Sequence, residues 1–406
     1  MDGRPVRQSM PYVRVQGSAR ERGRQYGAGA RQLVARSLVL YEALFAHYSH
    51  IDWPTARRRA ATYTEAIAAY APSCLEEMAG IAEGAGCDFE DILALNVRSE
   101  LRFAGPVAEL AAASSSGAAP VTTSLSGAAP DAAFPTDERG ECTAVVALPS
   151  ATADGHTLLA QNWDWKADMR ETNLLLEVQR DDGPNFLTMV EAGLLAKVGL
   201  NECGIGLVTN TLVSSLDRGE PGVPYHVVLR SIMDCESITQ VLERILSAQR
   251  SSSANYLVAS REGLAANFEC LPGDSGNVRV EAPRAGFFTH ANHFAHAPGL
   301  ARDHDQAVLA RDAGMVLIPD SFFRQERLDE LLRGQRVSVE LLQTALRDHT
   351  NHPDGICAHP HEDEPAFLRS ATIASVIMDL SAMKLWVADG NPCESPYRAI
   401  DCSTCL

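Results

Sequence analysis

The pattern of apolar residues changes abruptly close to residue 140. Before this point the chain has helical periodicity, over residues 18–101, in runs at 19–46, 55–71, 74–85 and 89–101. After it, short runs of β-type residues alternate with turn residues such as Asp154-Gly155 and Asp182-Gly183. Such closely spaced runs predict successive antiparallel hairpins.

Strands are predicted in two sets with helices between and after them. The strands of the first set are 143–148, 156–165, 173–180, 185–191, 194–200 and 205–212. Helices are predicted at 225–234 and 237–248, followed by strands at 255–260, 264–270, 278–282 and 286–291, a helical stretch over 301–348, and strands at 372–379 and 384–388. Two antiparallel sheets covered by two groups of helices account for this order, which predicts an α+β fold with four αββα layers.

Residues 104–136 form an Ala/Ser/Gly/Pro-rich stretch, which we interpret as a flexible linker because it has few large apolar groups. The chain then divides into a helical segment, 1–141, and a β-rich segment, 142–406. We expect these two segments to build one αββα domain together.

Charge and composition exclude several classes of function. With 35 Lys and Arg against 52 Asp and Glu, the net charge of −17 argues against nucleic-acid binding. No run approaches the roughly 18 apolar residues of a membrane span, and the start lacks the apolar region of a secretory signal, so we expect a cytoplasmic protein with no membrane partner. Ten cysteines are too dilute for a disulfide framework.

Cys142 is the most informative candidate because it lies between the predicted linker and the first strand. If the bond between Glu141 and Cys142 were cut, Cys142 would carry a thiol and a free α-amino group with a pKa of about 7.7–8.0, which suits a general base near neutral pH. One residue would then be nucleophile and base together. The alternative is an ordinary buried strand cysteine.

Three further residues are candidates for the same site. Asp164, in the run Gln161-Asn162-Trp163-Asp164-Trp165, lies at the far end of the hairpin that Cys142 opens, where its carboxylate could orient the amine. Asn292 and Asn210 each end a predicted strand, and their side-chain N–H groups could stabilise an oxyanion. Taken singly, each of these residues also fits a turn or cap role.

The histidines suggest a metal site only weakly. His290, His293 and His296 have a suggestive spacing, and the run 359–364 adds further ligand types, but a strand entering a loop does not place an i, i+3 series on one face. We therefore expect no metal and no cofactor. Cys402 and Cys405 are interpreted as part of a loose tail.

Short sequence blocks follow one another along nearly the whole chain: Val15-Gln16-Gly17, Glu21-Arg22-Gly23, Tyr26-Gly27, Gly80 to Ala85, Leu95 to Glu100, Glu141-Cys142-Thr143, Gln161 to Asp164, Glu191-Ala192-Gly193, Lys197 to Asn201, Gly222-Val223-Pro224 and Thr289 to His293. Taken together, these blocks resemble the penicillin acyltransferase family of N-terminal-nucleophile hydrolases. Many blocks in the same order make the resemblance specific.

The resemblance implies a precursor that cleaves itself before Cys142 into an α/β heterodimer, which could assemble further. It also implies that the Cys142 thiolate attacks a small N-acyl amide or thioester, that Asn292 and Asn210 bind the oxyanion and that Asp164 orients the amine. The expected activity is that of an amidohydrolase or acyltransferase. The alternatives are an acyl-coenzyme A-dependent N-acyltransferase of the penicillin-forming type and a pseudoenzyme that binds ligands without processing itself.

Two positions differ from the family pattern. Glu141 stands where the penicillin enzyme has Gly, and Ala358 stands where the pattern has an Arg after the cysteine, here Cys357. The absence of that Arg favours an amide hydrolase over a penicillin-forming acyltransferase.

Overall fold

The computed structural model describes residues 9–115, 141–295 and 312–406 of the chain. Two sheets lie at its centre. The first has the order β1 (Tyr12–Gly17), β4 (Asn173–Arg180), β5 (Phe186–Glu191), β6 (Val198–Asn201), β7 (Ile205–Thr211), β8 (Ala254–Ser260), β9 (Ala265–Cys270) and β10 (Val278–Glu281). The second has the order β11 (Phe287–His290), β2 (Thr143–Ala147), β3 (Leu158–Lys166), β12 (Ser370–Asp379), β13 (Lys384–Asp389) and β14 (Arg398–Asp401).

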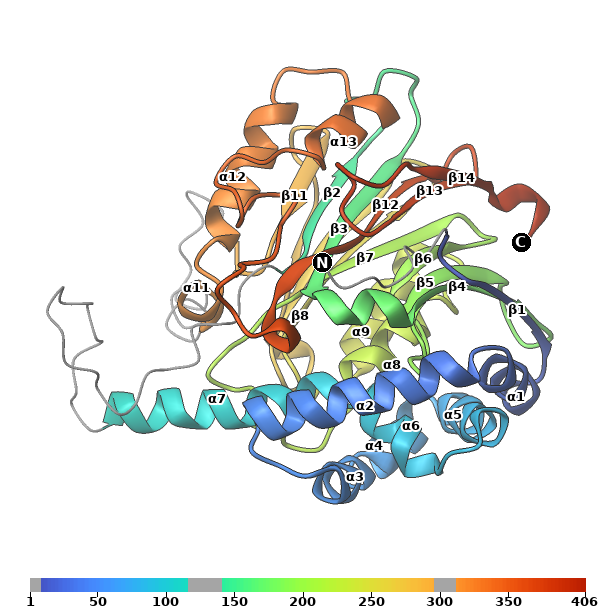
Figure 1. The fold of residues 1–406 in the computed structure, drawn as a ribbon. Coiled ribbons are helices and arrows are strands. Elements are labelled where there is room, and N and C mark those ends of the chain that lie inside the picture. Colours follow the sequence, from blue (N-terminus) through green and yellow to red (C-terminus); the bar gives the residue numbers. More distant parts are fainter. Residues whose placement is uncertain (1–8, 116–140, 296–311) are drawn as a thin grey trace, which may run out of the picture.

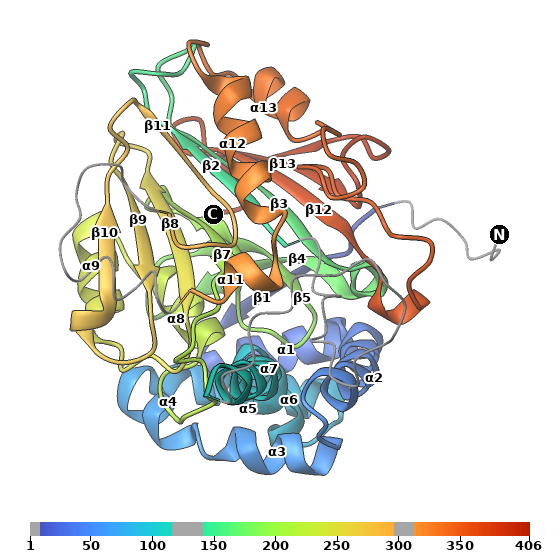
Figure 2. The ribbon, with the colours of Figure 1, turned by 90° about the vertical axis from the view of Figure 1, so that its left-hand side faces the viewer.

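Helices cover the outer faces of both sheets (Figures 1 and 2). On the side of the eight-stranded sheet are α1 (Ala19–Gly29), α2 (Arg31–Tyr48), α3 (Trp53–Ala61), α4 (Thr64–Tyr70), α5 (Pro72–Ala85), α6 (Phe89–Asn96), α7 (Arg98–Ser115), α8 (Tyr225–Ile232) and α9 (Ile238–Ser247). On the side of the six-stranded sheet are α12 (Ser321–Leu332) and α13 (Val339–Ala345), with the short α11 (Gly314–Leu317) before them. This arrangement confirms the predicted αββα fold.

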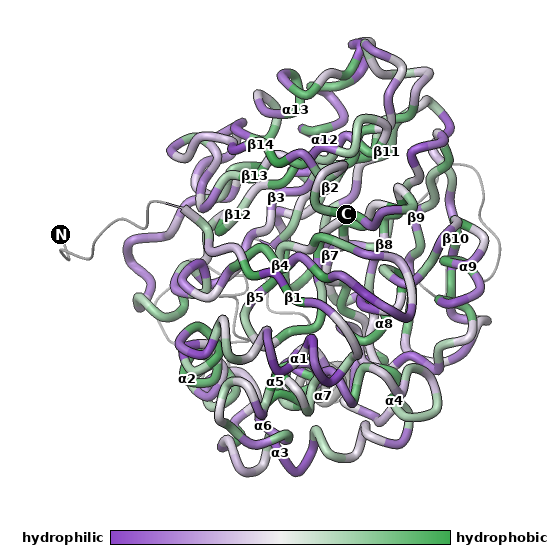
Figure 3. Tube along the Cα trace, turned by 90° about the vertical axis from the view of Figure 1, so that its right-hand side faces the viewer, coloured by the Kyte–Doolittle hydropathy of each residue, from purple (hydrophilic) through white to green (hydrophobic). Residues whose placement is uncertain are grey.

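Alternation along the strands explains how the layers pack. In β2, Ala144 and Val146 belong to the main core between the sheets, whereas Val145 and Ala147 pack with Leu328 of α12 in a second core. Both faces of this strand are therefore buried. Figure 3 shows the same division along the chain, with apolar stretches through the central strands and hydrophilic ones through outer helices and loops.

Helices α1 and α5 pack at unusually close range. A Cβ atom added at Gly27 would lie 2.1 Å from the carbonyl oxygen of Ile81, and one added at Gly84 would lie 2.1 Å from that of Arg24. Glycine is therefore required at these positions, where backbone meets backbone. Both glycines belong to the sequence blocks that carry the family resemblance.

Several predicted boundaries are corrected by the structure. Residues 104–115 continue α7 instead of starting the predicted linker, because the run is rich in alanine and Phe103 and Val107 pack against Val213. The rest of that linker, 116–136, and residues 301–311 of the predicted helical stretch lie outside the described residues.

Strands β1 and β14 were not predicted from the sequence. The first lies at the edge of its sheet and pairs in parallel with β4, a partner distant in the chain. The second pairs with β13 and is followed by a buried Cys402, so the expectation of a loose tail is wrong. Among the helices of the described ranges, none has the length and apolar character that crossing a bilayer demands.

Candidate active site

Cys142 lies immediately before β2, with its side chain inside the core between the sheets. It shares this core with Ala144 and Val146, and only 1% of its surface is exposed. Burial raises the pKa of the Cys142 thiol to about 12. In the intact chain, therefore, Cys142 is a neutral thiol that solvent does not reach.

The carbonyl group of Cys142 is held by two side chains from opposite sides of the fold. Asn210, in β7 of the other sheet, donates a hydrogen bond of 2.8 Å from Nδ2 to this oxygen. Arg324, in α12, donates one of 3.0 Å from Nη1 to the same oxygen and another of 2.8 Å to Thr143 Oγ1. The backbone one peptide unit after the predicted cleavage point is thus fixed by donors that can bind a carbonyl oxygen or an oxyanion.

Arg324 also connects this carbonyl to Asn292. Its Nη2 donates a hydrogen bond of 3.1 Å to Asn292 Oδ1, and its Nε bonds Asp320 Oδ2 at 2.6 Å. The guanidinium is almost fully buried, and its planar fork allows it to serve several acceptors at once. No sequence pattern indicated a role for Arg324, since an acid–arginine pair at i, i+4 on a helix is common on ordinary surfaces.

Asn292 is held in place from several directions. Its backbone N–H donates a hydrogen bond of 2.6 Å to Ser321 Oγ, at the start of α12. Its Nδ2 donates one of 3.0 Å to the carbonyl of Thr211, the residue next to Asn210. The two predicted amides therefore lie together, but in the intact chain one Asn292 N–H group already has a partner.

Asp164 lies on β3, which pairs with β2 so that Thr143 faces Asn162. Continuing this register by two residues places Asp164 opposite Glu141, at the predicted cleavage point. Its Oδ1 accepts a hydrogen bond of 2.5 Å from Thr372 Oγ1. Its Oδ2 is buried and has no hydrogen-bond partner among the described residues.

The surroundings of Asp164 favour its neutral form. Burial raises the pKa of this carboxyl to about 8, although Arg324 and the bond from Thr372 act in the opposite direction. The backbone N–H of Asp164 also hydrogen-bonds with the Cys142 side chain and lowers the pKa of its thiol, against the larger effect of burial. Asp164 thus contacts Cys142 through its backbone and retains one free carboxyl oxygen.

Glu141, on the N-terminal side of the predicted scissile bond, is also buried. Its Oε1 lies 3.5 Å from Arg102 Nη1, and the guanidinium carbon of Arg102 lies 4.1 Å from the centre of the Trp165 ring. The ion pair joins the end of the helical segment to α7. The sequence marked Glu141 only as the residue before the cut.

Lys197 is a further member of the site that had no role in the sequence interpretation. Burial lowers the pKa of its ammonium to about 8, and Arg98 lowers it further. Its Nζ lies 3.8 Å from the centre of the Trp163 ring, and its positive charge lowers the pKa of the Cys142 thiol. A buried cation near a cysteine favours the thiolate, the reactive form.

The histidines near Asn292 bind separate partners. His290 Nε2 lies 2.9 Å from Glu269 Oε1, and His293 Nδ1 lies 2.8 Å from Ser321 Oγ. His296 lies outside the described residues. In the part that the structure describes, these histidines therefore support the architecture around Asn292 individually.

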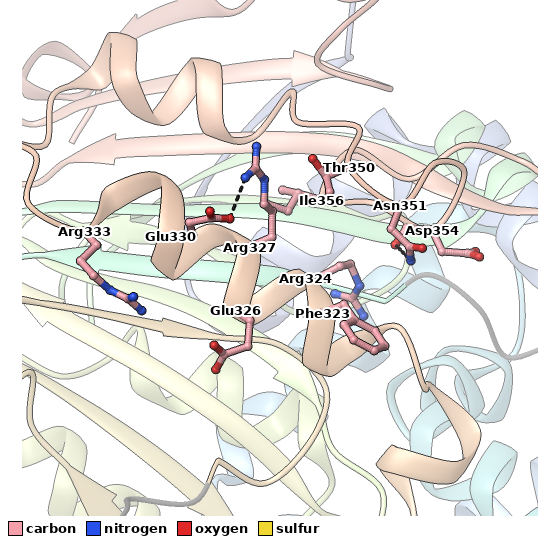
Figure 4. A pocket seen from close by; sticks show the side chains of 10 residues that line it. All are labelled: Phe323, Arg324, Glu326, Arg327, Glu330, Arg333, Thr350, Asn351, Asp354 and Ile356. Carbon is pink, nitrogen blue, oxygen red and sulfur yellow. Dashed lines mark hydrogen bonds and ion pairs between the residues drawn. The ribbon is translucent and has the colours of Figure 1, made fainter.

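A pocket of about 470 Å³ opens between α12 and the loop 350–356 (Figure 4). Its lining side chains are mostly charged: Phe323, Arg324, Glu326, Arg327, Glu330, Arg333, Thr350, Asn351, Asp354 and Ile356. The Cys142 sulfur is not part of this lining. Arg324 belongs both to the pocket and to the site around the Cys142 carbonyl, so the two lie one side chain apart.

Comparison with known proteins gives one family and several relatives. The family model for acyl-coenzyme A:6-aminopenicillanic acid acyl-transferase matches residues 151–394, more than half of the chain. The 40 kDa form of acyl-coenzyme A:6-aminopenicillanic-acid-acyltransferase from Emericella nidulans is 24% identical over 386 residues, which cover 94% of this chain and 93% of that protein.

Solved structures with a similar arrangement are more distant. A mutant conjugated bile acid hydrolase from Clostridium perfringens is 13% identical with a TM-score of 0.44, covering 65% of this chain and 93% of its own. Penicillin V acylase from Agrobacterium tumefaciens is 14% identical with a TM-score of 0.41, covering 64% of this chain and 86% of its own.

Proposed function

Because the chain belongs to the acyl-coenzyme A:6-aminopenicillanic acid acyl-transferase family, we propose that it is a self-processing cysteine amidohydrolase or acyltransferase. In this proposal the chain cuts itself between Glu141 and Cys142, giving segments 1–141 and 142–406 of one αββα domain. The new N-terminal Cys142 then cleaves a small N-acyl amide, or transfers its acyl group, through an acyl-enzyme.

The observation that carries the proposal is the convergence of side chains on Cys142, the residue that follows the proposed cut. Asn210 and Arg324 both donate to the Cys142 carbonyl, and Arg324 joins Asn292 to the same point. These groups come from β7, α12 and the segment after β11, which are far apart in the sequence. An ordinary strand cysteine requires no such set of donors.

Self-cleavage would proceed by an N-to-S acyl shift followed by hydrolysis. The Cys142 sulfur, after losing its proton, attacks the carbonyl carbon of Glu141 and forms a tetrahedral oxyanion. The Glu141–Cys142 C–N bond then breaks, and the nitrogen takes up a proton to become the Cys142 amine. Water hydrolyses the resulting thioester, which leaves a Glu141 carboxylate, a Cys142 thiol and a free α-amine.

The buried environment explains why the intact chain would be an inactive precursor. Cys142 is 1% exposed, and burial holds the pKa of its thiol at about 12, so substrate cannot reach a thiolate. Cleavage would release the chain that precedes Cys142 and create an ammonium group at the cut. The free Oδ2 of Asp164 is a suitable acceptor for that ammonium, which would orient the amine beside the sulfur.

The mature reaction would repeat the same chemistry on an external amide. The α-amine of Cys142 takes the proton of the thiol, and the thiolate attacks the acyl carbon. The α-ammonium then gives this proton to the leaving amine as the C–N bond breaks, and a thioester forms. The N–H groups of Asn210 and Asn292 would stabilise the oxyanion, with Arg324 holding Asn292 in place. Water then releases the acid, or an acceptor amine takes the acyl group.

The pocket beside Arg324 is our candidate for one side of the substrate site. Its volume of about 470 Å³ suits a small molecule, and its charged lining suits a substrate with polar groups. A second candidate activity is acyl-coenzyme A-dependent N-acyl transfer. The chain is similar to the Emericella nidulans enzyme along nearly its whole length, so this second activity should be included in any assay.

A panel of N-acylated amines and acyl-coenzyme A thioesters tests the proposed reaction. We expect amine release from at least one member, and an acyl adduct on the peptide that begins at Cys142 when the reaction is quenched with acid. Product formation that rises with an added acceptor amine would identify acyl transfer. Equal turnover by a Cys142→Ala variant, or an adduct on another residue, would contradict the proposal.

A further inference from the structure

Two histidines and two cysteines meet at one point outside the candidate active site. His349, Cys357 and His359 lie in the loop after α13, and Cys393 lies in the turn between β13 and β14. Each offers one ligand atom, and these four atoms all lie within 4.8 Å of one another. Imidazole nitrogen and thiolate sulfur are the ligands that structural zinc sites use.

Four of the six distances between the ligand atoms lie within about 0.2 Å of the edges of a tetrahedron around zinc. With Zn–S about 2.3 Å and Zn–N about 2.05 Å, the edges would be roughly 3.8 Å for S–S, 3.6 Å for S–N and 3.3 Å for N–N. Here Cys357 Sγ and Cys393 Sγ lie 3.6 Å apart, and the Nε2 atoms of His349 and His359 lie 3.1 Å apart. His359 Nε2 is 3.8 Å from Cys357 Sγ and 3.4 Å from Cys393 Sγ.

Groups around the cluster resemble the outer shell of a metal centre. Asn391 Nδ2 lies 3.6 Å from Cys357 Sγ and donates a hydrogen bond of 2.6 Å to the carbonyl of Ala358, between two of the ligands. His359 points Nε2 into the cluster, while its Nδ1 lies 4.0 Å from Glu394 Oε1. A hydrogen-bonded carboxylate on the far nitrogen is a recurring way to orient a zinc-binding histidine, and at 4.0 Å the exposed Glu394 is near His359 without making that bond.

We propose that His349, Cys357, His359 and Cys393 bind one zinc ion in a closed, tetrahedral structural site. On binding, the two thiols lose their protons to solvent, and the two thiolates balance the charge of the dication. Four protein ligands leave no open position for water or substrate, so the ion takes no part in the amide chemistry. The site is therefore independent of Cys142 and of the proposed reaction.

The loop that carries three of the ligands is also attached to the strands of the candidate active site. Asn162 Nδ2 in β3 donates hydrogen bonds of 2.8 Å each to the carbonyls of Leu346 and Ile356. The backbone N–H of Ala358 donates one of 2.9 Å to Thr372 Oγ1, the hydroxyl that binds Asp164. Zinc would tie the outer end of this loop to the turn after β13 and so hold its inner end against β3 and β12.

The local sequence does not indicate this site. The run 359–364 suggested metal ligands only together with the histidines at 290–296, whereas the structure joins His359 to Cys393 and to His349 and Cys357 of its own loop. Cys357 and Cys393 lie 36 positions apart, and nothing in their local sequence pairs them.

Metal analysis of the full chain, purified without a metal-affinity column, tests the proposal. We expect about one zinc per chain in the wild type and almost none in Cys393→Ser, with Cys203→Ser as the matched control that keeps its zinc. Cys203 is a partly exposed cysteine in the turn between β6 and β7, away from the cluster. Zinc retained in full by Cys393→Ser would overturn the proposal.

Cobalt substitution gives a readout that does not depend on how well the variant folds. Wild-type chain stripped with a chelator and loaded with Co²⁺ should show thiolate-to-cobalt charge-transfer absorption and the intense visible bands of a tetrahedral ion. Absence of these bands in folded wild-type protein, or a Cys357–Cys393 disulfide in protein prepared with zinc and a reductant, would contradict the site.

Discussion

Arg324 donates a hydrogen bond of 3.0 Å to the carbonyl oxygen of Cys142, from a helix on the outer side of the six-stranded sheet. The same guanidinium reaches Asn292. A single buried cation therefore couples the proposed nucleophile to a proposed oxyanion donor, and it does so in the uncut chain. This relationship makes Arg324 the first residue to change.

We predict that Arg324→Lys slows self-cleavage about a hundredfold or more, because an ammonium has three donors and cannot serve the four acceptors of this guanidinium in their fixed directions. Gel electrophoresis of samples taken after synthesis would give the rate. Arg327→Lys, on the same helix but paired with Asp348 and Glu330 near the surface, is the control and should cleave at the wild-type rate. Normal cleavage in Arg324→Lys would remove Arg324 from the mechanism.

Asp164 should give the intact precursor a characteristic pH dependence. Its pKa is about 8 in the fold against 3.8 ordinarily, so the folded state binds this proton more tightly than the unfolded state does. The free energy of unfolding should therefore fall as the pH rises from about 4 to about 8. Chemical unfolding of the uncleavable Cys142→Ala chain, with and without Asp164→Asn, isolates this contribution. The double variant should lose that part of the slope, and identical slopes would show that Asp164 is ionised throughout.

Lys197 should control how readily the Cys142 thiolate forms. Its charge lowers the pKa of the thiol, so Lys197→Met should raise that pKa and move the pH profile of self-cleavage to higher pH. Near neutral pH, the cleavage rate should fall about tenfold for each unit by which the pKa of the thiol rises, since only the thiolate attacks. Lys384→Met, an exposed position on β13, serves as the control. An unchanged profile in Lys197→Met would contradict this role.

The close packing of α1 against α5 predicts a sharp response to one methyl group. Gly27→Ala would place Cβ 2.1 Å from the Ile81 carbonyl oxygen, so the helices must separate, at a cost of about 1–3 kcal/mol in the free energy of unfolding. Denaturant titration would measure it in the Cys142→Ala background. Gly276→Ala, in an exposed turn where the nearest atom belongs to a side chain, should change stability much less. Equal effects would mean that the helices can move apart freely.

The sequence predicted those features that depend on local pattern. The switch near residue 140, the turn at Asp154-Gly155 and the alternation in β2 and β3 were enough to place Cys142 and Asp164 on one hairpin. Arg324 and Lys197 were not predicted, because the sequence does not distinguish a buried Arg or Lys from an exposed one. Only the packed fold shows that these two side chains are buried.

Features that join distant parts of the chain were also missed. The parallel pairing of β1 with β4 leaves no signature in the six residues of β1. Residues 104–115 were interpreted as linker because small residues bury little area, although alanine is also the best helix former. The ligands proposed for zinc come together only through the packing of two loops.

Intact-mass analysis with N-terminal sequencing of freshly made protein shows most directly whether Cys142 becomes an N-terminal nucleophile. We predict two polypeptides, residues 1–141 and 142–406, the second beginning Cys-Thr-Ala, and a single uncut chain for Cys142→Ala. A wild-type chain that hydrolyses amides while remaining whole, or a Cys142→Ala chain cut at the same bond, would contradict this role.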